Sequence, residues 1–507
     1  MARCERSNRR GVTRRGFLLG AAAGLAAGTP LGLLGVRAWD ALSRDRVPPQ
    51  SFTGTTREVN RPAAAMPGPF PGRVIEVRHP DAVRPDHTMN ARAIDGMIDH
   101  GMTELTGADD PQAAWRRFFE RDDVIGIKIN PVGRKPMPGE GGRVVGAVGS
   151  VSSPEVLLKV VRCLKDVGIK PGNIIVFERY AQEFYDAGYD RVMTERDMDG
   201  VRWLASAARY HDRQVNVEGF DEDRSNFSPE LVKHVAGYDP DVFVQMGFAG
   251  PQHDPKDDRS FRTHLSLIVS RIVNKIITLP VLKDHRSAGV TLALKNMSHG
   301  MNNNVARSHI PSFERPSVAD GVATHVDSTA PPPGDGTASA LPVQESGPNQ
   351  CNTFIPTAAS QHRIRQKATL HIMDGLIGVY EGGPGNWNRT WATWRRQSLF
   401  FATDPVALDH VGWDIIDAKR AAEGWQPVAN MGLLHYTSAD ALSAGLATLA
   451  ASGPLDELSL AAAGQNHFAG RSTEVFDSRQ PQHIILAEHL GMGVFDSRRI
   501  EHRVVLL

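Results

Sequence analysis

The sequence predicts an α/β fold, in which a mostly parallel, twisted sheet is flanked by helices and interrupted by a long loop insertion. Short runs rich in Val and Ile, such as residues 124–130, alternate along the chain with segments whose apolar residues recur at helical spacing. The lengths between these runs are typical of strand–helix–strand units, which place successive strands parallel in one sheet. Several runs also end in a polar residue, as expected where parallel strands meet a ligand-binding edge.

The first half of the predicted sheet contains one clear strand–helix–strand unit. Residues 124–130 end in Asn130, and a glycine-rich loop follows at 139–149. Ser153 followed by Pro154 predicts a helix start, with Ser as the N-cap and Pro in the first turn. The elements expected in this half are strands at 72–77, 124–130 and 173–178, and helices at 90–105 and 155–167.

The second half repeats the alternation of strands and helices. Residues 283–285 (Lys-Asp-His) are expected in a loop after a strand, and Asp404 before Pro405 predicts another helix N-cap. Residues 314–350 are rich in Pro, Gly, Ser, Thr and Asp and predict a long insertion or lid. The elements expected here are strands at 242–246, 275–280, 369–374 and 398–403, and helices at 265–273, 291–297 and 405–420.

The N-terminus has the pattern of a bacterial export signal. Residues 13–18 read Thr-Arg-Arg-Gly-Phe-Leu, an apolar run extends to about residue 34, and small residues follow. The paired arginines favour the twin-arginine translocase, which exports folded proteins, so we expect a periplasmic location. A chance arginine pair is the alternative, and an uncleaved leader would attach the chain to the membrane, since the run approaches the roughly 20 residues of a span. The expected divisions are a leader at 1–38, a linker at 39–70, the α/β domain at 71–453 and a C-terminal extension at 454–507.

Charge and cysteine content exclude two classes of protein. The leader holds seven of the 57 Lys and Arg residues but one of the 57 Asp and Glu residues, so the remainder is slightly acidic. Without a basic tract, nucleic acid is not an expected partner. The three cysteines, Cys4, Cys163 and Cys351, are far apart, which excludes a cysteine-ligated iron–sulfur cluster.

Chemically useful side chains gather at the predicted strand ends and in the segment that follows residue 280. His285 is a candidate acid, base or metal ligand because its usual pKa is near neutrality. Lys295 lies in an otherwise apolar predicted helix, where burial would make its amine more nucleophilic, unless its stem carries the charge to solvent. Asp374 at a predicted strand end is the third catalytic candidate, and a plain turn is its alternative. The residues expected to bind a cofactor are Lys128, Asn130, Lys283, Asn296 and Asp409.

Three histidines are candidate metal ligands. His285, His299 and His309 could supply imidazole ligands, but spacing of the H-E-x-x-H kind is absent. His299 and His309 flank an Asn-rich segment at 302–304, so a surface loop is the competing interpretation.

The motifs together resemble a known family. The order of VIGIKIN at 124–130, LPVLKDH at 279–285, VTLALKN at 290–296 and DPVALD at 404–409 is similar to that of domain of unknown function family 362 (DUF362). The likeness extends over roughly residues 74–420 and includes Ser153-Pro154-Glu155, Asp374-Gly375 and residues 381–384. Some members of that family carry ferredoxin-type clusters, but the cysteines that would hold one are missing from this chain.

A more distant resemblance connects the segment after residue 284 with nickel-pincer lactate racemases. His285, Ala288-Gly289 and Lys295 match the spacing of a His, an Ala-Gly pair and a Lys in those enzymes. The resemblance implies that His285 handles a proton or hydride and that Lys295 tethers a nickel-containing cofactor. The Gly-Gly that precedes the racemase lysine is replaced here by Ala293-Leu294.

Three functions remain open from the sequence. The first is an exported enzyme that depends on a cofactor or transition metal and performs redox or isomerase chemistry on a small anion, with Lys128, Lys283 and Lys295 neutralising the charge. The second is a non-catalytic periplasmic protein that binds a metal or ligand, or serves as an accessory. The third is a cell-envelope interaction protein held by its leader. The polar segments at strand ends favour the first two.

Overall fold

The computed structural model describes much of the chain from residue 66 to the C-terminus, and the described residues belong to one compact unit, Thr56–Leu507. The leader, most of the linker, most of the 139–149 loop, most of the 314–350 insertion and the first part of the expected 454–507 extension lie outside the described residues. The described ranges are 66–132, 137–138, 144–145, 151–309, 313–314, 326–327, 351–385, 391–425, 428 and 483–507, without the single residues 212, 247, 251, 255 and 286.

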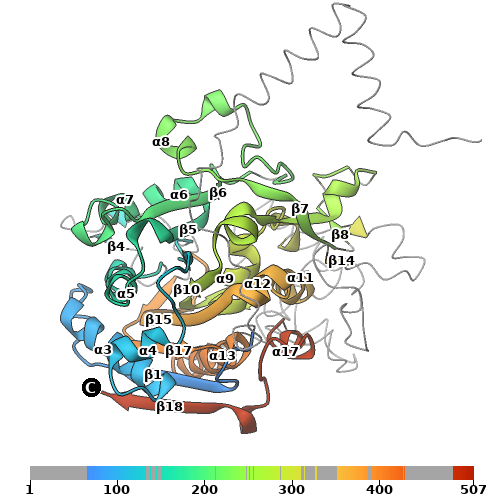
Figure 1. Cartoon of the computed structure of the whole chain (residues 1–507). Helices are drawn as coiled ribbons and strands as arrows, with labels where there is room; N and C mark the ends of the chain where they lie inside the picture. Colours follow the sequence, from blue (N-terminus) through green and yellow to red (C-terminus); the bar gives the residue numbers. More distant parts are fainter. Residues whose placement is uncertain are drawn as a thin grey trace, which may run out of the picture. The chain divides into compact units, whose positions relative to one another are not determined.

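A mixed sheet with a parallel centre organises the fold and confirms the predicted α/β class (Figure 1). Its parallel strands follow one another in the order β6, β5, β2, β10 and β15. Their bounds are β2 Ile125–Lys128, β5 Ile174–Tyr180, β6 Arg202–Ala207, β10 Lys275–Thr278 and β15 Ala368–Glu381.

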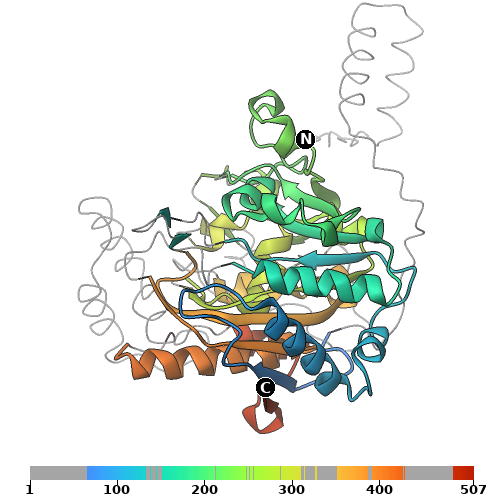
Figure 2. The ribbon, with the colours of Figure 1, turned by 90° about the vertical axis from the view of Figure 1, so that its left-hand side faces the viewer.

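The other side of the sheet is antiparallel and includes the end of the chain. β17 (Ser398–Ala402) pairs antiparallel with both β15 and β1 (Arg73–Arg78). β18 (Glu501–Leu506) then pairs parallel with β1, and the marked C-terminus lies beside β1 in both views (Figures 1 and 2). The last residues of the expected C-terminal extension are therefore a strand of the main sheet.

Alternating side chains of the strands supply two hydrophobic cores, one on each face. In β10, Ile277 belongs to one core and Ile276 to the other, and in β15 the same division separates Ile372 from Met373. The first core packs against α3 (Ala91–Thr106), α4 (Pro111–Arg116) and α5 (Pro154–Asp166). The second packs against α9 (Leu292–Met301), α11 (Cys351–Ala359), α13 (Pro405–Ala422) and α17 (His483–His489).

Helix starts agree well with the predicted caps. The Asp404 carboxylate accepts hydrogen bonds of 2.9 Å from the backbone N–H groups of Val406 and Ala407 at the start of α13. Ser153 is the N-cap residue of α5 by position, although its side chain makes no capping hydrogen bond. Short elements complete the described chain: α6 Ala181–Asp186, α7 Tyr189–Val192, α8 Pro229–Val232, α12 His362–Lys367, β3 Met137–Pro138, β4 Val144–Val145, β7 Tyr238–Gln245, β8 Phe248–Ala249, β13 Phe313–Glu314, β14 Val326–Asp327 and β16 Ala392–Trp394.

Three local predictions were wrong. The helix expected at 265–273 is strand β9 (Arg262–Ser266) followed by a π-helical turn at Ile268–Ile272, because a short apolar run does not distinguish helix from strand. Residues 283–285 lie in strand β11 (Val281–His285), which pairs with β15 and with β12 (Gly289–Val290). β15 continues to Glu381, so Asp374 lies within a strand and not at its end. Among the described residues, no helix is both long and apolar enough to span a bilayer.

Candidate functional site

A cavity of about 540 Å³ lies where β2, β5 and β11 end and is lined in part by helix α9. This is the carboxyl edge of the parallel strands, where ligands bind in open α/β sheets. The cavity brings together seven of the ten side chains that the sequence singled out: Lys128, Asn130, His285, Lys295, Asn296, His299 and His309.

Lys128 and Glu178 form an ion pair on neighbouring strands at the cavity wall. The Lys128 Nζ lies 2.5 Å from the Glu178 carboxylate, and each side chain is 2% exposed. Burial lowers the pKa of Lys128, while the Glu178 carboxylate opposes that shift. Helix α9 comes so close that a Cβ on Gly300 would lie 2.5 Å from the Lys128 Nζ. Glycine at that position therefore allows the helix to cover the ion pair.

Lys283 is buried behind the wall, next to Asn130. Its Nζ lies 3.4 Å from the Asn130 Oδ1 and donates to the backbone carbonyls of Pro384, at 3.3 Å, and Val132. Burial, together with the charge of Lys295, lowers the pKa of Lys283 to about 7. Lys283 thus supports the cavity by holding Asn130 and two loops, and it does not line the cavity itself.

Lys295 is the cation that faces the cavity from α9. Its Nζ lies 3.2 Å from the His309 Nε2, and its side chain is buried. Burial lowers the pKa of Lys295 to about 8, with the Arg179 guanidinium acting in the same direction and Cys351 opposing it. Near neutral pH this amine can therefore pair with an anion as an ammonium or accept a proton as a free amine.

His285 is fixed in one tautomer. Its Nδ1 accepts hydrogen bonds from the backbone N–H groups of Ser287, at 3.0 Å, and Ala288, at 3.2 Å. Burial and the charge of Lys295 hold the pKa of His285 well below its usual range. A neutral imidazole whose Nδ1 is an acceptor carries its proton on Nε2, so His285 can donate a hydrogen bond.

Several polar groups at the cavity are buried without a hydrogen-bond partner among the described residues, and the Tyr180 hydroxyl is one of them. Both the oxygen and the nitrogen of the Asn296 carboxamide are in this state, and so is the Thr291 hydroxyl. Asn296 is 4% exposed and Thr291 is 6% exposed. Because an unsatisfied buried polar group costs about 1–3 kcal/mol, this arrangement indicates a polar ligand that would complete it.

Asp374 and Asp409 lie outside this cavity and hold helix starts. The Asp374 carboxylate accepts from the backbone N–H of Ser153, at 2.7 Å, at the start of α5. The Asp409 carboxylate accepts from the N–H groups of Ala293, at 2.7 Å, and Leu294, at 2.9 Å, at the start of α9. Asp409 therefore acts on the site indirectly, by orienting the helix that carries Lys295.

Sequence reasoning overlooked three contributors to the site. Arg179 donates from its Nη1 to the backbone carbonyl of His299 at 2.7 Å and so ties β5 to α9. Thr291 lies within the VTLALKN motif at 290–296, but the sequence did not single it out as a site residue. Cys351 begins α11 and lies beside His299 and His309, although 42 residues separate it from the nearer one. Only the tertiary fold brings these groups together.

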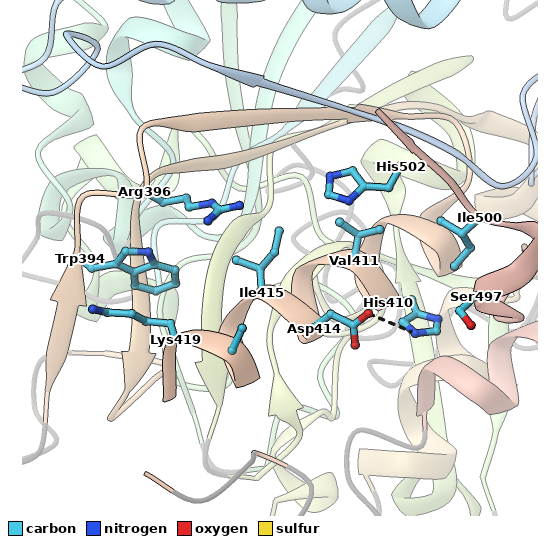
Figure 3. A pocket seen from close by; sticks show the side chains of 11 residues that line it. Trp394, Arg396, His410, Val411, Asp414, Ile415, Lys419, Ser497, Ile500 and His502 are labelled. Atoms are coloured by element: carbon cyan, nitrogen blue, oxygen red, sulfur yellow. Dashed lines mark ion pairs between the residues drawn. The ribbon is translucent and has the colours of Figure 1, made fainter. Parts of the chain in front are cut away.

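A second cavity, of about 600 Å³, lies between α13, β16 and the C-terminal strand (Figure 3). Its charged groups already have partners. Arg396 and His502 both contact the buried Glu76 carboxylate, at 2.8 and 3.0 Å, and His410 lies 3.6 Å from Asp414. Among the described residues, this cavity is lined by satisfied ion pairs and lacks the orphan polar groups of the first.

Comparisons with known proteins identify a family and no characterised relative. Neither the curated proteins nor the solved structures include a significant match. The family model described as domain of unknown function (DUF362) matches residues 125–414, more than half of the chain. The match contains β2, β5, β11 and α9, which carry the cavity. The chain therefore belongs to the DUF362 family.

Proposed function

We propose that the chain is an enzyme that binds a small anion in the β2–β5–β11 cavity and transfers a proton on it. The observation that carries this proposal is that Lys295 and the unsatisfied polar groups of Asn296 and Thr291 are buried side chains lining one cavity. A carboxylate would pair with the Lys295 ammonium, and an adjacent hydroxyl or carbonyl would satisfy the amide and hydroxyl. Small hydroxy acids combine both groups.

The basic groups around the cavity support proton transfer. Lys295 and His309 are 3.2 Å apart, so a proton can pass between Nζ and Nε2. The His285 Nε2–H is available to stabilise negative charge that develops on a substrate oxygen. Isomerisation of a hydroxy acid through its Cα requires removal of a proton from one face and return of a proton to the other, and the paired Lys295 and His309 bases suit that reaction class.

The test is hydrogen exchange at carbon. D-lactate, L-lactate and glycolate are incubated with the protein in D₂O, and loss of the Cα proton signal is followed by NMR. We expect exchange with at least one of them, and a loss of exchange of at least a hundredfold in Lys295→Met. Lys159→Met on α5, outside the cavity, is the matched control and should retain full exchange. If Lys295→Met exchanges as fast as this control, the site assignment is wrong.

A non-catalytic binding protein is the second candidate, since the same cavity would hold an anion without turnover. Saturable binding of these acids, with no exchange of the Cα proton in the wild-type chain, would favour it over the enzyme.

We further propose that the chain is exported through the twin-arginine translocase, on the strength of Arg14 and Arg15 before the apolar run. Replacing both with Lys should retain the protein in the cytoplasm. Unchanged periplasmic recovery of the Arg14→Lys/Arg15→Lys variant would reject this route.

A further inference from the structure

Three side chains that could bind a metal ion form a compact group, and two of them, His299 and His309, line the same cavity. His299, His309 and Cys351 each offer one ligand atom, and these atoms all lie within 4.8 Å of one another. His299 comes from α9, Cys351 is the first residue of α11, and His309 follows the short 3-10 turn Ala306–Ser308. Three separate segments thus direct nitrogen and sulfur atoms to one place.

The Ser308 hydroxyl marks the centre of this group. Its Oγ lies 2.8 Å from the His299 Nε2, 3.0 Å from the His309 Nδ1 and 3.8 Å from the Cys351 Sγ. All three ligand atoms therefore already surround a single polar atom. Bonds of about 2.0 Å from nitrogen and 2.3 Å from sulfur would draw them closer around an ion. A rotation of the Ser308 side chain would make the space.

From this geometry we propose that His299, His309 and Cys351 bind a divalent transition metal ion such as Zn²⁺. Two imidazoles and one thiolate are a donor set suited to Zn²⁺ and Co²⁺, and three protein ligands leave a fourth position open. His299 and His309 both line the cavity, whereas Cys351 closes the group from α11. The open position therefore faces the cavity in which the anion is proposed to bind.

His285 is not part of this group, although the sequence placed it with the other two histidines. Its ring centre lies 5.4 Å from that of His309, but its Nδ1 is already occupied by two backbone N–H groups. His299 and His309 are closer, with ring centres 4.8 Å apart. Cys351 replaces His285 as the third ligand.

Metal binding by these three side chains is inferred from their geometry and does not depend on any substrate. A negative result for the metal would therefore leave the proposed anion site unaffected. The test is titration of the full-length, metal-free chain with Co²⁺, whose absorption spectrum reports thiolate ligation and tetrahedral geometry. We expect one equivalent to bind with a sulfur-to-cobalt charge-transfer band. The band should persist in the Cys4→Ser/Cys163→Ser chain, in which Cys351 is the one remaining cysteine, and disappear in Cys351→Ser.

Two further variants separate a metal site from a hydrogen-bonded cluster. His299→Ala should weaken Co²⁺ binding at least tenfold, whereas Ser308→Ala should retain the charge-transfer band because the ion displaces that hydroxyl. Circular dichroism shows that each variant is folded before titration, and Zn²⁺ competition gives the affinities. Absence of stoichiometric Co²⁺ binding in the wild-type chain would overturn the proposal. A cobalt spectrum of folded Cys351→Ser that is the same as that of the wild-type chain would also overturn the proposal.

Discussion

Replacement of Asn296 by Leu should stabilise the ligand-free protein and weaken ligand binding. The carboxamide of Asn296 is buried on α9, and neither its oxygen nor its nitrogen has a partner among the described residues. Each such group costs about 1–3 kcal/mol when it is withdrawn from water unpaired. Leu has a similar size and carries no polar atom, so Asn296→Leu removes that cost.

We expect the free energy of unfolding to rise by about 1–3 kcal/mol, after allowance for imperfect packing of the leucine. Urea denaturation followed by circular dichroism measures this change, and a higher midpoint with an unchanged m-value shows that stability itself has changed. Anion binding should weaken by up to about tenfold, the value of one neutral hydrogen bond.

Asn302→Leu is the matched control, because Asn302 is buried just beyond the same helix with both amide atoms satisfied. Its nitrogen donates to the Ser298 carbonyl at 2.7 Å, and its oxygen accepts from the Gln361 amide at 2.7 Å. Asn302→Leu should therefore destabilise the chain by about 1–3 kcal/mol. If Asn296→Leu destabilises the chain as much as Asn302→Leu, the Asn296 amide has hydrogen-bond partners in the ligand-free protein. Its lack of partners then no longer indicates a ligand.

Three further predictions concern the surroundings of the cavity. Glu178→Gln leaves the buried Lys128 ammonium without its carboxylate and should lower the free energy of unfolding by about 3–5 kcal/mol in urea denaturation. The double variant Lys128→Met/Glu178→Leu should recover most of this loss, and equal losses in the two variants would contradict the prediction. Asp409→Ala should reduce the free energy of unfolding by about 1–3 kcal/mol and weaken anion binding in calorimetry, because α9 loses the carboxylate that caps it. Anion binding at the wild-type level would show that this cap does not orient Lys295. For Glu76, desolvation raises the pKa, but hydrogen bonds from His502, Arg78 and Ser398 outweigh it and hold the pKa well below the usual 4.5. Its stabilisation is therefore present above about pH 4.5 and lost as the pH falls below that value, so Glu76→Gln should be less stable at pH 7 and lose less on acidification; parallel acid profiles would be the contrary result.

Much of the fold was predictable because the strands are short and strongly apolar. Residues 124–130 and 173–178 coincide with β2 and β5, and the cap at Asp404 was confirmed at α13. The elements that were wrong depend on tertiary pairing. The Lys-Asp-His segment at 283–285 is polar and has no local strand signal, yet it is held as a strand by β15 and β12.

Part of the candidate site was also predictable from the sequence. Asn130 and His285 follow from the rule that parallel strands present ligands at their carboxyl ends, whereas Lys295 was marked by its place in an otherwise apolar predicted helix. The sequence does not distinguish a carboxylate that caps a helix from one that faces a ligand, so Asp374 and Asp409 had the same pattern as true site residues. Cys351 could not be placed at all, because its contact with His309 depends on how α11 packs against α9.

Isothermal titration with glycolate and the two lactate enantiomers is the most direct test of the claim that this cavity is an anion site. We expect saturable one-to-one binding of at least one acid to the wild-type chain, and a loss of about tenfold to a hundredfold in Lys295→Met, the value of a charge-assisted hydrogen bond. Lys159→Met should bind as the wild type does. Binding of the same strength in Lys295→Met, or no binding of any of these acids to the wild-type chain, would contradict the account.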